Sequence, residues 1–185
     1  ETVSRKVYRK NPRAEKTTVL GESSIGVANL VETAGNILDA SMKDIFTDVD
    51  IYDDQVRLLQ FPFTSPIGKD AIGFYRYYIV DTCYIDKDQC IQLTFVPNNQ
   101  QDFGFRGDIW VLNDSTLHVR KVSLTIPKKS DVNFVDNMKI EQEYVKLPDG
   151  QWVLDTDNML VELKLNRMLN NAVVIRTTKL SDYKF

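Results

Sequence analysis

A long pair of apolar runs is the feature that most constrains how this 185-residue chain can fold. Residues 73–96 read GFYRYYIVDTCYIDKDQCIQLTFV, in which apolar and polar residues alternate on both sides of Asp86 and Lys87. A period of two indicates β-strands, and a polar pair between two such runs is typical of a hairpin turn. The segment therefore predicts a long β-hairpin that turns at Asp86 and Lys87.

The register of this hairpin follows from its apolar residues. If Asp86 and Lys87 form the turn, Val80 lies opposite Leu93 and Tyr78 lies opposite Phe95. This register places large apolar side chains together on one face, and cross-strand packing of that kind determines register.

The same register places the only two cysteines, Cys83 and Cys90, opposite each other. A directly opposite pair lies about 5.5 Å apart between Cα atoms if it is hydrogen bonded, which is within the range of a disulfide. A bridge that closes so short a loop would add little stability. The sequence leaves both a disulfide and two free thiols open.

Further strands are predicted after the hairpin. Alternating runs occur at Val122 to Ile126, Met138 to Tyr144, Trp152 to Leu154, Met159 to Leu165 and within 172–185. LPDG at 147–150 is a turn sequence, and DTDN at 155–158 predicts a bulge. Two prolines in FPFTSPIG at 61–68 predict a loop or an edge strand. The half-polar strands indicate that one face of the sheet meets water or a partner.

Residues 24–46 have a different period. Apolar residues recur there at steps of three and four, which is the pattern of an amphipathic helix, at Val27, Val31, Ala34, Leu38, Met42 and Ile45. Gly35 also allows two short helices. We therefore predict an α+β fold, mostly antiparallel β, with this helix packed on one face of an open sheet.

The first sixteen residues are basic and polar, and we predict a linker or arm at 1–16 followed by a single domain at 17–185. The arm is either a solvated connection or a basic segment that contacts phosphate or an acidic partner. The formal net charge of the whole chain is −3, which argues against nucleic acid as a partner. No apolar run is long enough to span a bilayer.

Catalytic and metal motifs are sparse, so we expect no catalytic residues, metal site or cofactor. His118 is the only histidine, and we interpret it as an ordinary strand residue. No glycine-rich phosphate loop is present. Two acidic clusters, at 48–54 and 155–158, are turn or helix-end aspartates, a calcium site, or paired carboxylates of a hydrolase; we favour the first interpretation.

Aromatic residues are concentrated between residues 61 and 110. They either pack in the core or line a groove for a lipid-like ligand or an apolar peptide. The predicted lining consists of Phe61, Phe63, Phe74, Tyr78, Phe95, Phe103, Phe105 and Trp110.

Several ordered motifs carry a family resemblance. FPFTSPIG, FYRYYIVDT, CIQLTFVPNNQQDFGFRGDIWV, VSLTIPKKSDVNFV, IEQEYVKLPDGQWVL and RTTKLSDYKF follow one another between Asp48 and Phe185. Together they resemble the middle region of uncharacterised outer-membrane proteins of Gram-negative bacteria. These proteins carry an N-terminal carboxypeptidase-regulatory-like domain and a downstream membrane β-barrel. The family has no assigned catalytic residues, so the resemblance transfers none.

Leu93 to Pro97 and Ile109 to Val111 are also similar, more weakly, to the periplasmic lipoprotein-carrier fold. That fold is an unclosed antiparallel half-barrel whose helices cover an apolar concave face. The resemblance implies that NNQQDFGF connects two adjacent strands near such a groove. It also implies the periplasm, where a bridge between Cys83 and Cys90 can persist.

Three functional hypotheses follow. The chain is a non-enzymatic module that binds a lipid or apolar peptide, a structural module that docks neighbouring domains of the same full-length chain, or, least favoured, a hydrolase. We expect it on the periplasmic side of the outer membrane, in contact with the membrane only through the full-length protein.

Overall fold

A computed structural model describes residues 1–9, 11–12, 14–23, 47–58, 61–99, 102–126, 135–163 and 172–185. The chain divides into two compact units, Glu1–Lys43 and Asp44–Phe185. The helix predicted over 24–46 lies outside the described residues.

The described part of the first unit is a two-stranded antiparallel hairpin. Strand β1 (Thr2–Arg9) pairs with β2 (Ala14–Glu22), and a bulge interrupts the register next to Val3. All of the described side chains from residue 1 to residue 23 are exposed. The segment 1–16, which we predicted as a linker or arm, thus lies within this hairpin, and the predicted boundary at 16/17 falls inside β2.

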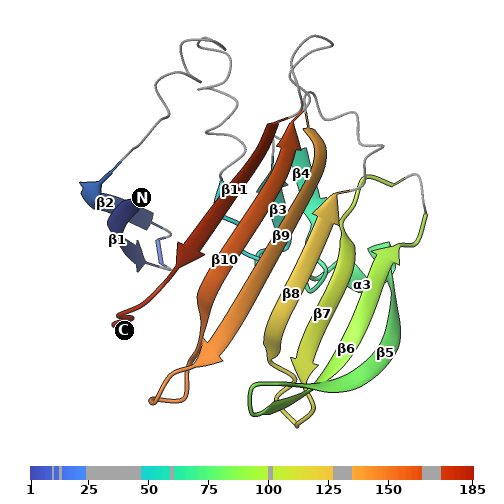
Figure 1. Ribbon diagram of the computed structural model, residues 1–185. Coiled ribbons are helices and arrows are strands. Elements are labelled where there is room, and N and C mark those ends of the chain that lie inside the picture. The colour runs from blue at the N-terminus through green and yellow to red at the C-terminus, as the bar shows by residue number, and fades with distance from the viewer. Residues whose placement is uncertain are drawn as a thin grey trace. The chain divides into compact units, whose positions relative to one another are not determined.

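The second unit is built on a seven-stranded antiparallel sheet (Figure 1). Its strands follow one another in the order of the chain: β5 (Tyr75–Ile85), β6 (Asp88–Pro97), β7 (Arg106–Leu112), β8 (Val119–Ile126), β9 (Val135–Lys146), β10 (Trp152–Leu163) and β11 (Ala172–Lys179). The order does not close on itself, so β5 and β11 are the two edges. The prediction of a mostly antiparallel, open sheet is confirmed.

One face of this sheet is covered by the chain segment that precedes it. Strands β3 (Gln55–Leu58) and β4 (Phe61–Thr64) form a small antiparallel pair that lies behind the sheet in Figure 1, and the short helix α3 (Ala71–Phe74) leads into β5. FPFT is thus an edge strand, where a proline does not interrupt a central ladder. The covering residues and the sheet share one core, to which the segment contributes Val49, Ile51, Val56, Leu58 and Phe63.

Alternation along the strands produces the other half of this core. In β9, Met138, Ile140, Gln142 and Tyr144 are buried, whereas the side chains that alternate with them are half-buried or exposed. The buried residues of β8 and β10 include those that the sequence predicts, such as Val122 and Met159. Each fully buried aliphatic side chain contributes about 1.5–3 kcal/mol relative to an exposed one, so the buried residues of these strands stabilise the fold.

The hairpin of β5 and β6 confirms one half of its predicted register and corrects the other. Cys83 pairs with Cys90, and Asp86 and Lys87 form the turn, with Asp86 at φ 54°. The prediction that Val80 lies opposite Leu93 and Tyr78 opposite Phe95 is wrong. Leu93 pairs with Ile79, and Phe95 pairs with Tyr77. A bulge at Val80 adds one residue to β5, and every pair beyond it shifts by one.

The other local predictions fare as follows. The bulge predicted in DTDN is present, because the pairing of β9 and β10 shifts between Leu154 and Thr156. LPDG forms the turn between these strands. NNQQDFGF connects the adjacent strands β6 and β7, as predicted. We expected His118 to lie within a strand. It lies instead in the connection immediately before β8.

Candidate functional site

The eight aromatic residues predicted to line a groove do not share one environment. Phe63, Phe95 and Phe105 are completely buried, and Phe74, Phe103 and Trp110 are half-buried. Phe61 and Tyr78 are 45% and 52% exposed. The set is therefore divided between core, boundary and surface.

Four of these residues form a stack that runs inward from the surface. Phe61 contacts Phe103 edge-on at 5.5 Å between ring centroids, and Phe103 contacts Phe63 at 4.5 Å. Phe63 then stacks on Phe105 at 4.7 Å, 22° from parallel. Offset and edge-on pairs at these distances are favourable beyond the area they bury. The stack fills the space between β4 and the connection before β7.

Two tyrosines missed by the sequence analysis complete this packing. The Tyr75 hydroxyl donates a hydrogen bond to the Thr64 carbonyl at 2.7 Å, and the Tyr77 hydroxyl donates to that of Pro66 at 2.6 Å. Burial raises the pKa of both phenols, that of Tyr77 to about 12. These bonds tie the first half of β5 to the covering segment. The alternation of FYRYY could have placed Tyr75 and Tyr77 on the inner face if the bulge at Val80 had been anticipated.

A glycine permits the close packing around α3. A Cβ atom at Gly104 would lie 2.5 Å from Cε1 of Phe74. Any side chain at this position would therefore displace the Phe74 ring, which packs on Tyr75 at 4.8 Å.

The second half of β5 is the most exposed apolar region of the described sheet. From Tyr78 to Thr82 every side chain is exposed, so the described residues cover neither face of the strand there. Ile79 is 76% exposed although it pairs with Leu93 on the core side, and Tyr84 further along is 69% exposed. An edge strand presents unpaired backbone N–H and C=O groups, and with exposed apolar side chains it can pair with an additional strand.

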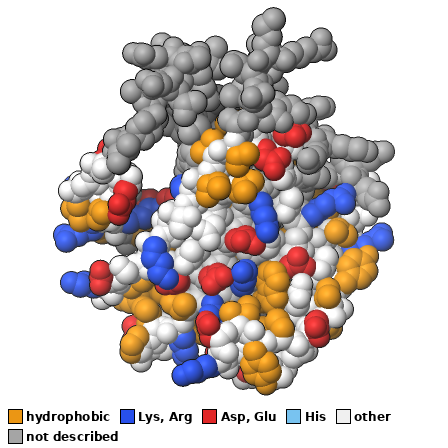
Figure 2. Space-filling model, viewed as in Figure 1, with side chains coloured by type: hydrophobic (Ala, Val, Ile, Leu, Met, Phe, Trp, Pro, Cys, Tyr) orange, Lys and Arg blue, Asp and Glu red, His pale blue; other side chains and the backbone are white. Residues whose placement is uncertain are grey.

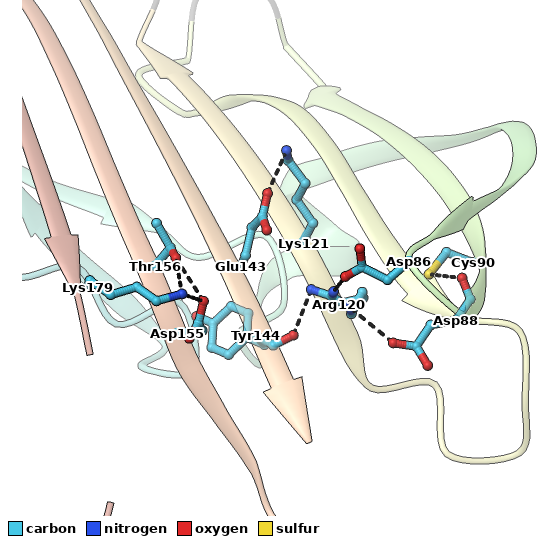
Figure 3. A network of polar contacts seen from close by, with 10 residues as sticks. All are labelled: Asp86, Asp88, Cys90, Arg120, Lys121, Glu143, Tyr144, Asp155, Thr156 and Lys179. Carbon is cyan, nitrogen blue, oxygen red and sulfur yellow. Dashed lines mark hydrogen bonds and ion pairs between the residues drawn. The ribbon is translucent and has the colours of Figure 1, made fainter. Parts of the chain in front are cut away.

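A buried arginine holds the tip of the β5–β6 hairpin over the sheet (Figure 3). Arg120 is 4% exposed and occupies a bulge in β8, opposite Trp110 and Val111. Its guanidinium donates to Asp86 at 2.5 Å, to Asp88 at 3.1 Å and to the Tyr144 carbonyl at 2.9 Å. The guanidinium thus joins the hairpin tip to β9, two strands beyond the hairpin's neighbour β7.

A polar network lies inside the core near the other edge. The Gln142 amide donates to the Val49 carbonyl at 2.7 Å and to Asp157 at 3.0 Å, while its oxygen accepts from the Tyr144 hydroxyl at 2.9 Å. Arg176 of β11 pairs with Asp157 at 2.7 Å. Hydrogen bonds among buried polar groups of this kind make the packing specific.

The two acidic clusters are held by cations. Asp54 pairs with Lys69 at 2.8 Å, and Asp155 pairs with Lys179 in β11. Hydrogen bonds from these lysines lower the pKa of both carboxyl groups. A general acid in a hydrolase requires a raised pKa, so neither Asp54 nor Asp155 suits that role. Across the described ranges, no three His, Cys, Asp or Glu side chains are grouped so that they could hold a metal ion.

The outer face of the sheet is mixed in character (Figure 2). Lys121 pairs with Glu143 at 3.0 Å and lies 5.8 Å from the ring centroid of Trp110. A shallow hollow of about 290 Å³ lies over β9 to β11, and its lining includes Lys139, Glu141 and Thr177. None of the predicted aromatic residues lines this hollow. The described part of the chain contains no helix that is long and apolar enough to cross a membrane.

Comparisons with known proteins locate the chain in a family. No curated protein and no solved structure matches it. A family of unknown function, DUF5686, matches residues 22–183, which include the whole of the seven-stranded sheet but only the last residue of β2. The chain therefore belongs to the DUF5686 family.

Proposed function

We propose that this chain is a non-enzymatic docking module on the periplasmic side of an outer-membrane protein, with β5 as its contact strand. Its occupant is an extended, apolar segment of a neighbouring domain of the same full-length protein. Such a segment adds to the sheet as an eighth strand, through backbone hydrogen bonds and side-chain contacts on both faces.

The exposure of β5 carries this proposal. Tyr78, Ile79 and Val80 are consecutive, large and apolar, and all three are exposed. Proteins usually protect such an edge with charge, proline or a covering element. Here the charged residues Arg76 and Asp81 flank the apolar run but do not interrupt it.

The packing of the aromatic residues favours docking over a lipid carrier. A carrier requires an apolar space on the concave face of its sheet. In the described residues, the space over β5 to β7 contains the rings of Phe63, Phe95 and Phe105, each fully buried. These rings pack against the protein itself, whereas Tyr78, Ile79 and Val80 of β5 are exposed.

The location and the partner rest on the resemblance of the ordered motifs to outer-membrane proteins with a carboxypeptidase-regulatory-like domain. The open strand order supports a half-barrel-like architecture. The helical period of residues 24–46 supports a further covering element. The family match is compatible with these inferences and is silent on function.

Site-specific photo-crosslinking in the full-length protein, expressed in its own host, tests the proposal. Benzoyl-phenylalanine at Ile79 should give a crosslink to another segment of the same protein, which mass spectrometry of the digested product identifies. The matched control is the same probe at Ile175, which is also exposed and lies on the opposite edge strand. Equal crosslinking from both positions, or none from Ile79, would refute β5 as the contact strand.

A further inference from the structure

The two cysteines occupy directly opposite positions in the β5–β6 hairpin. Cys83 pairs with Cys90, three pairs from the last pair of residues before the bulge, Ile79 and Leu93. Opposite residues of an antiparallel ladder lie about 4.5–5.5 Å apart between Cα atoms, and disulfides occur at about 4.4–6.8 Å. Both thiols are free in the structure. The backbone thus holds two thiols on the same face at a separation that a covalent bond can span.

The environments of the two thiols differ. Cys83 is half-buried, whereas Cys90 is fully buried and its Sγ lies 3.5 Å from the Asp88 carbonyl oxygen. Burial, followed by the proximity of Cys83, raises the pKa of the Cys90 thiol. Cys83 is therefore the more accessible thiol, and Cys90 is the buried thiol of the pair.

The hairpin that carries the pair is held in place. Arg120 contacts Asp86 in the turn and Asp88 at the start of β6, both on the chain between the two cysteines (Figure 3). This contact limits the motion of the strand ends on which the thiols lie. When two thiols are held at a separation and orientation that allow a disulfide bond, the effective concentration of one thiol near the other is raised.

We propose that Cys83 and Cys90 form a reversible dithiol–disulfide site, whose co-reactant is a small-molecule or protein disulfide. The Cys83 thiolate attacks one sulfur of the co-reactant, forms a mixed disulfide and releases the first thiolate. Cys90 then loses its proton to solvent and attacks the Cys83 sulfur, which expels the second thiolate. Two electrons pass from the cysteines to the co-reactant, which leaves as two thiols after protonation.

This inference is independent of the docking proposal. It rests on the register of the hairpin and on the burial of its thiols, and it would stand if β5 had no partner. The thiol–disulfide exchange at this site requires no side chain of the protein other than the two cysteines.

Equilibration with oxidised and reduced glutathione tests the site. The chain is equilibrated over a range of glutathione ratios, quenched with an alkylating reagent and analysed by mass spectrometry. The same titration is repeated in urea, where the hairpin is absent. We expect the constant for intramolecular disulfide formation to be at least about tenfold larger in buffer than in urea, because the folded strands place the thiols together.

A matched variant separates register from closeness in sequence. In the double variant Gln89→Cys, Cys90→Ser, the second thiol moves by one residue to the position opposite Tyr84, on the other face of the hairpin. Its loop is nearly the same length, so its disulfide constant in urea should match that of the wild type. The disulfide-formation constant of the variant should be smaller in buffer than in urea, whereas that of the wild type should be larger in buffer than in urea.

The result that overturns the proposal is equally direct. A wild-type constant in buffer equal to or below that in urea would show that the fold opposes the bond. Accumulation of the glutathione adduct at Cys83 without ring closure would have the same meaning. If the double variant fails to fold, the comparison of wild type in buffer and in urea still decides the question.

Discussion

The two edge strands of the sheet carry apolar residues in different ways. In β11 the side chains alternate, with Val173 and Ile175 exposed and Val174 and Arg176 half-buried on the core side. In β5 the alternation stops after Tyr77, and the following five side chains are all exposed. An apolar residue on the outer face of β11 is ordinary for a sheet with one wet face. In β5 the described residues cover neither face between Tyr78 and Thr82.

The difference has a structural origin in what lies against each edge. Arg176 of β11 pairs with Asp157 inside the sheet, so the inner face of that strand is occupied by the network around Gln142. The covering segment reaches β5 only as far as the bonds from Tyr75 and Tyr77 to residues 64 and 66. Beyond them a bulge at Val80 interrupts the register of β5. Bulges bend the strand that carries them and increase its local twist.

Truncation of the aromatic stack should have the largest effect, because the stack is the core that supports the covered half of β5. Phe63→Ala removes a fully buried ring and should cost about 3–5 kcal/mol of unfolding free energy. Phe61→Ala is the matched control at the exposed end of the same stack, and it should cost about 1 kcal/mol or less. Urea denaturation followed by tryptophan fluorescence measures both. Equal costs would contradict the assignment of Phe63 to the core.

Loss of the arginine at the hairpin tip should have an intermediate effect. Arg120→Met removes the hydrogen bonds to Asp86, Asp88 and the Tyr144 carbonyl. Since the side chains of Asp86 and Asp88 are 79% and 40% exposed, water can solvate them afterwards, and we expect a loss of about 1–3 kcal/mol. Arg120→Lys should recover only part of it, because ammonium lacks the planar fork. Denaturant unfolding that left Arg120→Met as stable as wild type would remove Arg120 as an anchor.

Alkaline pH should loosen the covered half of β5. The folded-state pKa of Tyr77 is raised to about 12 by burial, and that of Tyr75 is raised further. The neutral phenol is therefore favoured by folding. This stability is complete below about pH 10, the ordinary tyrosine pKa, and is lost as pH rises through the folded-state values. Tyr77→Phe should make unfolding free energy fall less steeply between pH 10 and 12, as denaturant titrations at each pH measure. An unchanged slope would contradict the burial of this phenol.

Substitutions at the two edges should barely change stability. Ile79→Lys and Ile175→Lys each replace an exposed side chain and should alter unfolding free energy by no more than about 0.5 kcal/mol. Thermal denaturation of the two variants checks this. A large loss of unfolding free energy in Ile79→Lys alone would mean that the protein itself buries Ile79. The two edge strands would then not differ in the way described.

Local patterns predicted much of the sheet, and tertiary effects account for the errors. Alternation identified the buried residues of β8 and β9, and turn chemistry located the turns at Asp86 and at LPDG, because both depend on near neighbours. No glycine or proline near Val80 indicates the bulge. The predicted register beyond it was therefore wrong by one residue. The β1–β2 hairpin was missed because its basic residues obscure the alternation.

The candidate site was predicted less well than the fold. Composition identified a concentration of aromatic residues but could not distinguish Phe63, which is in the core, from Phe61 on the same strand, which is at the surface. Ile79 and Val80 were not selected, because exposure depends on where the covering segment ends. The salt bridges that hold the acidic clusters also come from distant residues, such as Lys179 with Asp155.

Hydrogen exchange at the two edges tests the account most directly. Backbone amides of β5 and β11 that point away from the sheet have no partner strand among the described residues. Their exchange rates are to be compared between the isolated chain and the full-length protein. If β5 is the contact strand, its outward amides between residues 78 and 82 should exchange at least about tenfold more slowly in the full-length protein, with those of β11 unchanged. Unchanged exchange in β5, or equal slowing at both edges, would contradict the account.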